Sequence, residues 1–321
     1  MSNRKLHIGG NESHPEWEIL NINDGPHVDH CMDLRDISSF DDDTFSEIYA
    51  SHILEHFDYQ EELLLVLADL FRTLTPGGKL YASVPDMDSL CSLFTSKNIT
   101  FQEQYLIMRM IFGGHVDQYD YHLIGLNQDL LEFYLKISGF INFNKVENFN
   151  LFSDASSLCI KGQPISINII SEKPRSTDQV NENYESIFTM AIEYHQQGEI
   201  DLARMIYQSI LQKQPDHADA LHLLGVLTSQ AGLFEQGVEL IQRAIDIYPD
   251  NPVFFNNLGT IYFNHEKYSE AIEAFENTVR LNPSHVEAYK QLESCLKQLG
   301  RLEEANAVNK KIEKINTDKE N

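Results

Sequence analysis

Three prolines in the second half of the chain, Pro215, Pro249 and Pro283, are separated by 34 residues each. In the same register, residues of one kind recur at fixed positions: Ala191, Gly225 and Gly259; Ala203, Gly237, Ala271 and Ala305; Tyr207, Ile241, Phe275 and Val308; Met190, Leu224, Leu258 and Leu292. A unit of this length cannot bury its apolar face alone, so neighbouring units must stack. Helical hairpins fit the pattern, because small residues let two helices approach closely and proline ends the second helix. The repeat therefore predicts an all-α solenoid.

Several segments of this array resemble tetratricopeptide (TPR) repeats. They are LLGVL at 223–227, NLGTIYF at 257–263 and YSEAIEAFENTVRLNP at 268–283. The resemblance divides the array into units at 184–217, 218–251, 252–285 and 286–316. We expect Gly198, Gly232 and Gly300 to end first helices in the left-handed conformation.

The repeats predict a binding role, because solenoid curvature creates a concave groove that can hold a protein or peptide partner. The alternative is a spacer that only separates other parts of the protein. TPR glycosyltransferases carry a ladder of asparagines in their groove. Asn257 stands at such a position, but Leu223 stands one unit earlier. We therefore do not expect that binding mode here.

The first half, 1–173, alternates apolar runs typical of strands with helical patterns, and a polar segment at 174–183 indicates a linker. Strands are expected at 6–8, 18–22, 28–32, 47–50, 79–84, 141–149 and 165–170, and helices at 61–74, within 89–112 and at 127–138. Asn127 is the expected N-cap of the last helix and Gly139 its left-handed end. This alternation predicts an α/β domain with a mostly parallel sheet covered on both faces.

Parallel sheets of this kind bind ligands at the carboxyl ends of their strands, near the point where strand order reverses. Small or polar residues follow the first four expected strands: Gly9-Gly10-Asn11, Asn23-Asp24, Asp33-Leu34 and Ser51-His52. Glycines let the backbone approach a ligand, and carboxylate or amide oxygens accept hydrogen bonds from ribose hydroxyls or an exocyclic amine.

Four strings in this half resemble class I S-adenosylmethionine (SAM)-dependent methyltransferases, which have a Rossmann-like fold. They are FDDDTFSEIYAS at 40–51, YASHILEHF at 49–57, LTPGGKLYASVPD at 74–86 and FGGHVDQYDYH at 112–122. The resemblance implies S-adenosyl-L-methionine as cofactor. By it, Gly9 and Gly10 contact the methionine part, Asn23 and Asp24 the ribose, Asp33 and Leu34 the adenine, and Ser51 and His52 the floor beside the sulfonium. An acidic pocket with oxygen acceptors would suit that cation.

The sequence departs from the family in three places. Asn11 stands where the last loop glycine is usual, and Asn23 where the ribose-binding acid is usual. Only residues 9–16 separate the first two strands, fewer than the 10 to 12 expected of a helical crossover. Either the crossover is a bare loop, as in relatives without the first helix, or the strand assignment is wrong.

The motif His52-x-x-Glu55-His56 admits several interpretations. This order of ligands occurs in inverse zincins, so it is compatible with a metal site. Alternatively, Glu55 and His56 cap a helix and brace the sheet edge, or they contact substrate. The family resemblance gives the simpler account, and we expect no metal. His52, His56 and His122 are the candidate bases for the methyl acceptor, with His122 on a lid at 113–125 hinged at Gly113-Gly114.

Charge narrows the possible partners. The formal net charge is −25, which disfavours nucleic acid and anionic lipid surfaces. No apolar run reaches the length of a membrane span and no signal-peptide core is present, and four scattered cysteines favour a cytoplasmic location. The run Asp41-Asp42-Asp43 is expected to be a solvated turn and not a calcium loop.

We therefore expect a SAM-dependent methyltransferase acting on a glycan, sugar nucleotide or other small metabolite. The rival is a scaffold protein whose methyltransferase-like domain has lost turnover, and the altered glycine loop favours it. A nucleotide-sugar or dinucleotide enzyme ranks last, because no GxGxxG fingerprint is present.

Overall fold

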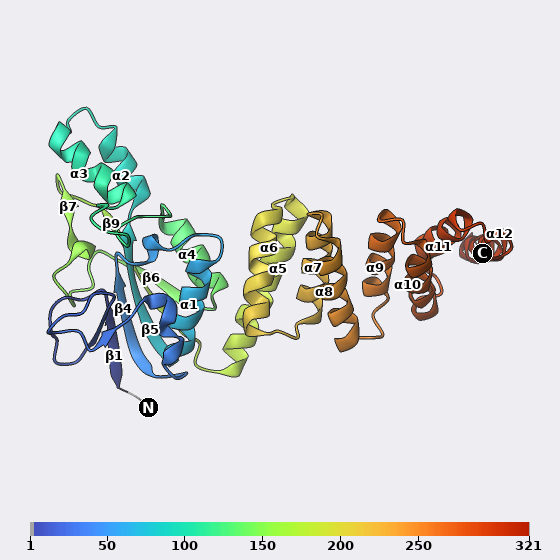
Figure 1. Ribbon diagram of the computed structural model, residues 1–321, viewed down its shortest axis with the longest axis horizontal. Helices are drawn as coiled ribbons and strands as arrows, with labels where there is room; N and C mark the ends of the chain where they lie inside the picture. The colour runs from blue at the N-terminus through green and yellow to red at the C-terminus, as the bar shows by residue number, and fades with distance from the viewer. Residues whose placement is uncertain (1–2, 321) are drawn as a thin grey trace. The chain divides into compact units, whose positions relative to one another are not determined.

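The computed structural model describes residues 3–320, with side chains described for 3–317. The chain divides into two compact units, with the boundary between Ile187 and Phe188. Figure 1 shows the sheet with its helices in the first unit and paired helices throughout the second. No helix of the described residues is long and apolar enough to cross a membrane.

The first unit is built on a seven-stranded sheet of order β3-β2-β1-β4-β5-β9-β6. Its strands are β1 Arg4–Ile8, β2 Glu18–Asn21, β3 His30–Cys31, β4 Phe45–Ser51, β5 Leu74–Pro85, β6 Ile141–Val146 and β9 Ser166–Glu172. Strands β1 to β5 are mutually parallel, and β9 is antiparallel to both of its neighbours, β5 and β6. The mostly parallel α/β sheet predicted from the alternating pattern is confirmed, with β6 at the edge and the antiparallel strand inside it.

The chain order reverses at β1, because β2 and β3 lie on one side of it and β4 lies on the other. Strands β1 and β2 are parallel, with Leu6 opposite Glu18 and Ile8 opposite Leu20. Residues 9–17 join them without a helix. The first two strand assignments were therefore correct, and the crossover is a bare loop.

Two helices cover one face of the sheet. Helices α1, Glu62–Thr73, and α4, Gln128–Ile137, pack against each other and against β5 and β6. Asn127 caps α4 by accepting a hydrogen bond from the Leu130 N–H, and Gly139 has φ +102°, as predicted. After α1, β5 begins at Leu74 with no intervening turn, so Pro76-Gly77-Gly78 lies within the strand.

A loop covers part of the opposite face, where a crossover helix is missing. Phe149 and Phe152 pack there against strand residues, with ring centroids 3.9 Å apart for Phe152 and His7 and 4.7 Å for Phe152 and Tyr49. Phe149 contacts Tyr49 and Tyr81 edge-on. Over β1 and β4 the covering expected on both faces is therefore provided by these aromatic loop residues and not by a helix.

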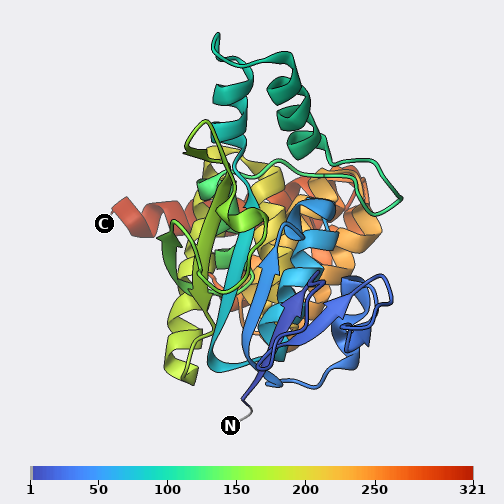
Figure 2. The same cartoon turned by 90° about the vertical axis from the view of Figure 1, so that its left-hand side faces the viewer.

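A helical pair lies beyond the carboxyl end of β5 (Figure 2). The single helix expected within 89–112 is two helices, α2 Met87–Phe94 and α3 Phe101–Phe112. Thr100 starts α3 with a capping box to Glu103, which explains the break. A short hairpin, β7 Cys159–Ile160 with β8 Gln163–Pro164, packs its Ile160 into the same small core as Leu90 and Ile107.

The second unit consists of helical hairpins. Its helices are α5 Thr177–Gln197, which begins in the first unit, α6 Ile200–Lys213, α7 Ala218–Gln230, α8 Phe234–Ile247, α9 Pro252–Asn264, α10 Tyr268–Leu281, α11 Val286–Gln298 and α12 Leu302–Glu320. Gly198, Gly232 and Gly300 have left-handed backbone angles, as predicted. A Cβ on Gly225 would lie 2.8 Å from the Gly237 carbonyl oxygen, so small residues mark the helix contact.

The segment expected to be a linker, 174–183, is helical from Thr177 onward as the first turns of α5. The Asn183 side chain donates a hydrogen bond to the Gly139 carbonyl in the first unit. The polar residues that indicated a linker therefore form the start of a helix, and polar contacts help to attach this helix to the rest of the first unit.

Candidate active site

A cavity of about 430 Å³ lies at the carboxyl ends of β1, β2 and β3, beside the point where strand order reverses. Its volume is within the range of small-molecule and cofactor sites. Most of its wall is apolar, with polar groups at a few places, and it is lined by Ile8, Gly9, Leu20, Asn21, Ile22, Met32, Asp33, Leu34, Arg35, Ile53, His56, Phe57, Gln118, Tyr119, Tyr121 and Leu123. Gly9, Asp33, Leu34 and His56 are thus the sequence-predicted site residues that line it.

The two loop glycines have different surroundings. Gly9 follows β1 with φ +78°, and its backbone forms part of the cavity wall. A Cβ there would lie 2.6 Å from the Ile53 Cδ1. Gly10 is not among the lining residues; a Cβ on it would lie 2.7 Å from the His7 Nδ1, so its small size accommodates that buried ring.

The end of β2 differs from the expectation that centred on Asn23 and Asp24, neither of which lines the cavity. The strand stops at Asn21 because the Asn21 amide group turns back to the first loop, donating to the Gly10 carbonyl and to the Asn11 side chain, each at 3.1 Å. Its Oδ1 accepts from the Asn23 N–H, which forms the turn. Asn21 is therefore the polar residue at this strand end, one that the sequence analysis missed.

The third strand end supplies a carboxylate, but one that already has partners. Asp33 caps a 3-10 helix, η1 Leu34–Ser39, by accepting from the Arg35 N–H at 2.9 Å. The Arg35 guanidinium lies 3.1 Å from the Asp33 carboxylate and bonds Glu62 as well. Asp33 is the only carboxylate among the lining residues, so the expected acidic pocket is in fact mostly apolar.

After β4, the chain turns sharply below the cavity. His52 has φ +52° and donates its backbone N–H to the Ser83 carbonyl. Neither Ser51 nor His52 lines the cavity. The following 3-10 helix, η2 Leu54–His56, presents His56 to the cavity and buries Glu55, whose side chain is 1 % exposed.

Histidines and Glu55 form a buried cluster behind this wall. The His52 Nδ1 lies 3.5 Å from a Glu55 Oε1, and the His122 Nε2 lies 3.9 Å from the same oxygen. The His56 and His122 rings meet edge-on with centroids 4.8 Å apart. Burial lowers the pKa of His52 and of His122 to about 4 and raises the pKa of Glu55 to about 8. At neutral pH the two histidines are therefore uncharged.

The segment 113–125 closes over this cluster. The Leu123 N–H donates to the Glu55 carbonyl at 2.8 Å, and the Tyr121 carbonyl lies 3.0 Å from the His56 Nδ1. The segment also bonds to itself, because the Asp120 carboxylate accepts from the Gly114 and Val116 N–H groups. A Cβ on Gly113 would lie 2.4 Å from the Asp120 carbonyl oxygen, so Gly113 serves close backbone packing in this arrangement.

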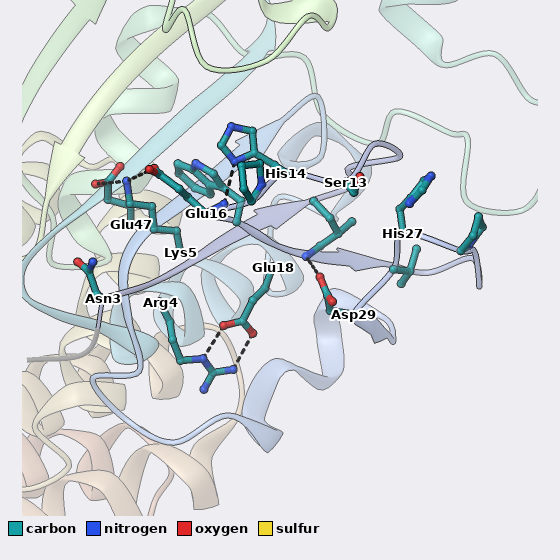
Figure 3. A pocket seen from close by; sticks show the side chains of 15 residues that line it. Asn3, Arg4, Lys5, Ser13, His14, Glu16, Glu18, His27, Asp29 and Glu47 are labelled. Atoms are coloured by element: carbon teal, nitrogen blue, oxygen red, sulfur yellow. Dashed lines mark hydrogen bonds and ion pairs between the residues drawn. The ribbon is translucent and has the colours of Figure 1, made fainter.

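A larger cavity of about 910 Å³ lies around the amino ends of β1 and β2 (Figure 3). Both of its basic side chains are already paired: Arg4 binds Glu18 through two nitrogens, at 2.6 and 2.7 Å, and Lys5 lies between Glu47 and Glu16. It lies away from the strand ends where ligands of such sheets bind. We therefore assign the candidate site to the smaller cavity.

The fold and this cavity define the class: a Rossmann-like α/β domain with a cavity at its switch point, followed by helical repeats. Family comparison matches residues 15–82 to a methyltransferase domain, and residues 194–256 and 252–285 to tetratricopeptide repeats. The chain thus combines a methyltransferase domain with TPR repeats, as the sequence motifs indicated.

Several proteins are similar to a part of this chain. A TPR repeat-containing protein of Methanocaldococcus jannaschii, MJ1428, is 23% identical over 145 residues, which are 42% of this chain and 25% of that protein. The N-terminal acetyltransferase A complex auxiliary subunit NAA15 of Arabidopsis thaliana is 22% identical over 117 residues, 36% of this chain and 13% of its own. This chain therefore spans a quarter or less of the length of these relatives. The crystal structure of MamA matches with 23% identity and a TM-score of 0.41, covering 43% of this chain and 80% of that one.

Proposed function

We propose that the first unit is a SAM-dependent methyltransferase and that the TPR array recruits its acceptor or a partner protein. The observation that carries the proposal is the cavity at the carboxyl ends of β1, β2 and β3, with the left-handed backbone of Gly9 on one wall and Asp33 on another. Methyltransferase domains of the matched family generally bind SAM.

The donor groups suit this cofactor. The apolar wall of Leu20, Ile22 and Leu34 offers a surface for the adenine ring, and Asp33 retains lone pairs to accept from the exocyclic amine. In this proposal the Asn21 amide oxygen accepts from the ribose hydroxyls, the role that was first expected of Asn23 and Asp24. Ser51 and Gly10 remain beside the site, at the ends of β4 and β1, without lining the cavity.

In this proposal the methyl acceptor is contacted by three residues that line the cavity, His56, Tyr119 and Tyr121. His56 is the first candidate for the base. Its Nδ1–H donates to the Tyr121 carbonyl when the ring is neutral, which leaves the lone pair on Nε2. His52 and His122 stand behind it in the cluster. The acceptor class stays a glycan, sugar nucleotide or other small metabolite.

The second candidate function is a scaffold protein without turnover. The observation that favours it is that Asp33 is the one lining carboxylate and is already held by Arg35. Calorimetry with SAM and with S-adenosylhomocysteine separates the two functions. We expect both ligands to bind one per chain. Absence of binding by either ligand, and absence of a copurified cofactor in the mass spectrum, would refute the methyltransferase proposal and leave the scaffold.

The lid hypothesis has its own test once an acceptor is found. We expect His122→Ala to lower turnover while SAM affinity stays within twofold, because His122 does not line the cavity. Unchanged turnover would remove His122 and the lid from the mechanism.

A further inference from the structure

The buried carboxylate of Glu55 has no hydrogen-bond partner for either of its side-chain oxygens among the described residues. Its side chain is 1 % exposed. An isolated buried carboxylate is strongly unfavourable unless a proton or a cation compensates it. Glu55 must therefore either carry a proton or face a cation.

The hydrogen bonds of His52 show that a second acceptor faces the Glu55 carboxyl group. The Ser166 hydroxyl donates to the Ala155 carbonyl, which can only accept. The His52 Nε2, 2.9 Å from the same hydroxyl oxygen, is therefore the donor to it. A neutral His52 then has its lone pair on Nδ1, and this atom lies 3.5 Å from the Glu55 Oε1. Two acceptors face each other, so a proton or a metal ion belongs between or beside them.

Two more imidazoles converge on the same carboxylate. One ligating atom from each of Glu55, His56 and His122 lies within 4.8 Å of the other two. The His56 Nδ1 is taken up by the Tyr121 carbonyl, which fixes the tautomer that keeps Nε2 free. Such a carbonyl behind a histidine is the usual support of a metal ligand.

We propose that Glu55, His56 and His122 bind one divalent transition-metal ion of the Zn²⁺ class, with the His52 Nδ1 beside the site and not among the ligands. Two imidazoles and one carboxylate with an open position form a ligand set of catalytic zinc sites. Imidazole nitrogens disfavour Ca²⁺ and Mg²⁺, which prefer oxygen ligands. Metal–ligand bonds of about 2.0–2.2 Å require the three atoms to draw together by roughly 1 Å. This inference replaces the earlier expectation that no metal binds.

The ion would stand directly behind the cavity wall, because His56 lines the cavity. This step rests on the proposed function: a hydroxyl of the acceptor at the open position would lose its proton more readily, and the proton would pass to the lone pair on the His52 Nδ1. The ion would then replace the His56 imidazole as the activating group. Metal binding itself does not depend on SAM binding.

The test uses the full chain without an affinity tag, stripped with a chelator and dialysed against Zn²⁺ or Co²⁺. We expect one ion per chain by elemental analysis, visible d–d absorption for Co²⁺, and dissociation constants raised about 100-fold or more by Glu55→Gln and by His122→Gln. His115→Gln is the matched control: His115 is an exposed histidine of the same segment, stacked on Tyr121 at 4.1 Å, and should bind the metal like the wild type.

Failure of the wild-type chain to bind either ion would overturn the proposal and assign the cluster a shared proton. Binding that survives both substitutions would overturn it as well, because the ion would lie elsewhere. If Glu55→Gln does not fold, as judged by its thermal transition, His122→Gln decides alone. Calorimetry with SAM on the same preparations keeps the two proposals apart, since a chain that binds metal but no SAM refutes only the proposed function.

Discussion

Replacing Gly9 by alanine tests whether the cavity holds the cofactor. Gly9 and Gly162 have nearly equal backbone angles, with φ +78° and +79°. A Cβ at Gly9 would lie 2.6 Å from the Ile53 Cδ1, whereas a Cβ at Gly162 would meet nothing within 4 Å. Gly162 lies in the turn between β7 and β8, outside the cavity lining. The two substitutions therefore share a positive φ and differ in their contacts.

The expected magnitudes follow from these contacts. The left-handed conformation costs an alanine about 1–2 kcal/mol at either position. A carbon–carbon separation of 2.6 Å is far inside the optimal range of about 3.5–4.0 Å, so Ile53 must shift at a further cost of about 1–3 kcal/mol. Ile53 lines the cavity, so a cofactor that contacts Ile53 in its original position can bind only if Ile53 moves back. The binding free energy is then weaker by that cost. We expect the SAM dissociation constant to rise about 5- to 150-fold for Gly9→Ala.

The assay is calorimetric titration of SAM into both variants, with thermal unfolding recorded in parallel. Gly162→Ala should bind SAM like the wild type while losing a similar amount of stability to strain. The reasoning fails if both variants bind SAM with the wild-type dissociation constant, because the cofactor would then not contact this wall.

Two further predictions concern the repeats. Burial lowers the pKa of His222 to about 4 from 6.5, so the array should lose stability as pH falls from 6.5 toward 4; this costs about 2 kcal/mol between pH 7 and 5. Urea titrations at both pH values should show that His222→Gln removes most of this dependence, and an equal dependence in the variant would contradict the assignment. Gly237→Val should destabilise the array by at least about 1–3 kcal/mol, because a Cβ there would lie 2.7 Å from the Gly225 carbonyl oxygen. Glu239→Val, at an exposed position of the same helix, is the control, and equal unfolding midpoints for the two variants would refute the close contact.

The repeats could be predicted in detail because their signal is local and recurs at one period. The left-handed helix ends at Gly198, Gly232 and Gly300 followed from residue type alone. In the third unit the equivalent turn is made by Glu266 with φ +59°, and a glutamate side chain does not indicate a left-handed conformation. At that position only the repeat register, and not the residue type, predicts the left-handed turn.

Strand ends were harder to predict, because side chains compete with the backbone for hydrogen bonds. The apolar run at 28–32 predicted a full strand, but β3 has only two residues. The Asp29 carboxylate accepts from the Ile19 N–H at 2.8 Å and so takes the place of a backbone carbonyl in the ladder. Similarly, Asn21 ends β2 by bonding the loop after β1. Polar residues inside an apolar run are therefore a signal that the strand stops early.

The cluster around Glu55 lay beyond local reasoning for a different reason. As part of a short helical segment, Glu55 was compatible with a helix-capping role, which would have left its carboxylate in water. Its burial depends on residues 121–124, whose backbone bonds to His56 and to the Glu55 carbonyl seal the site from more than sixty residues away. A carboxyl group enclosed by so distant a segment, where burial raises its pKa to about 8, is retained at a cost in stability. That cost has a physical reason only if a proton or an ion is held there, which is why the metal titration, and not a stability measurement, decides what the cluster does.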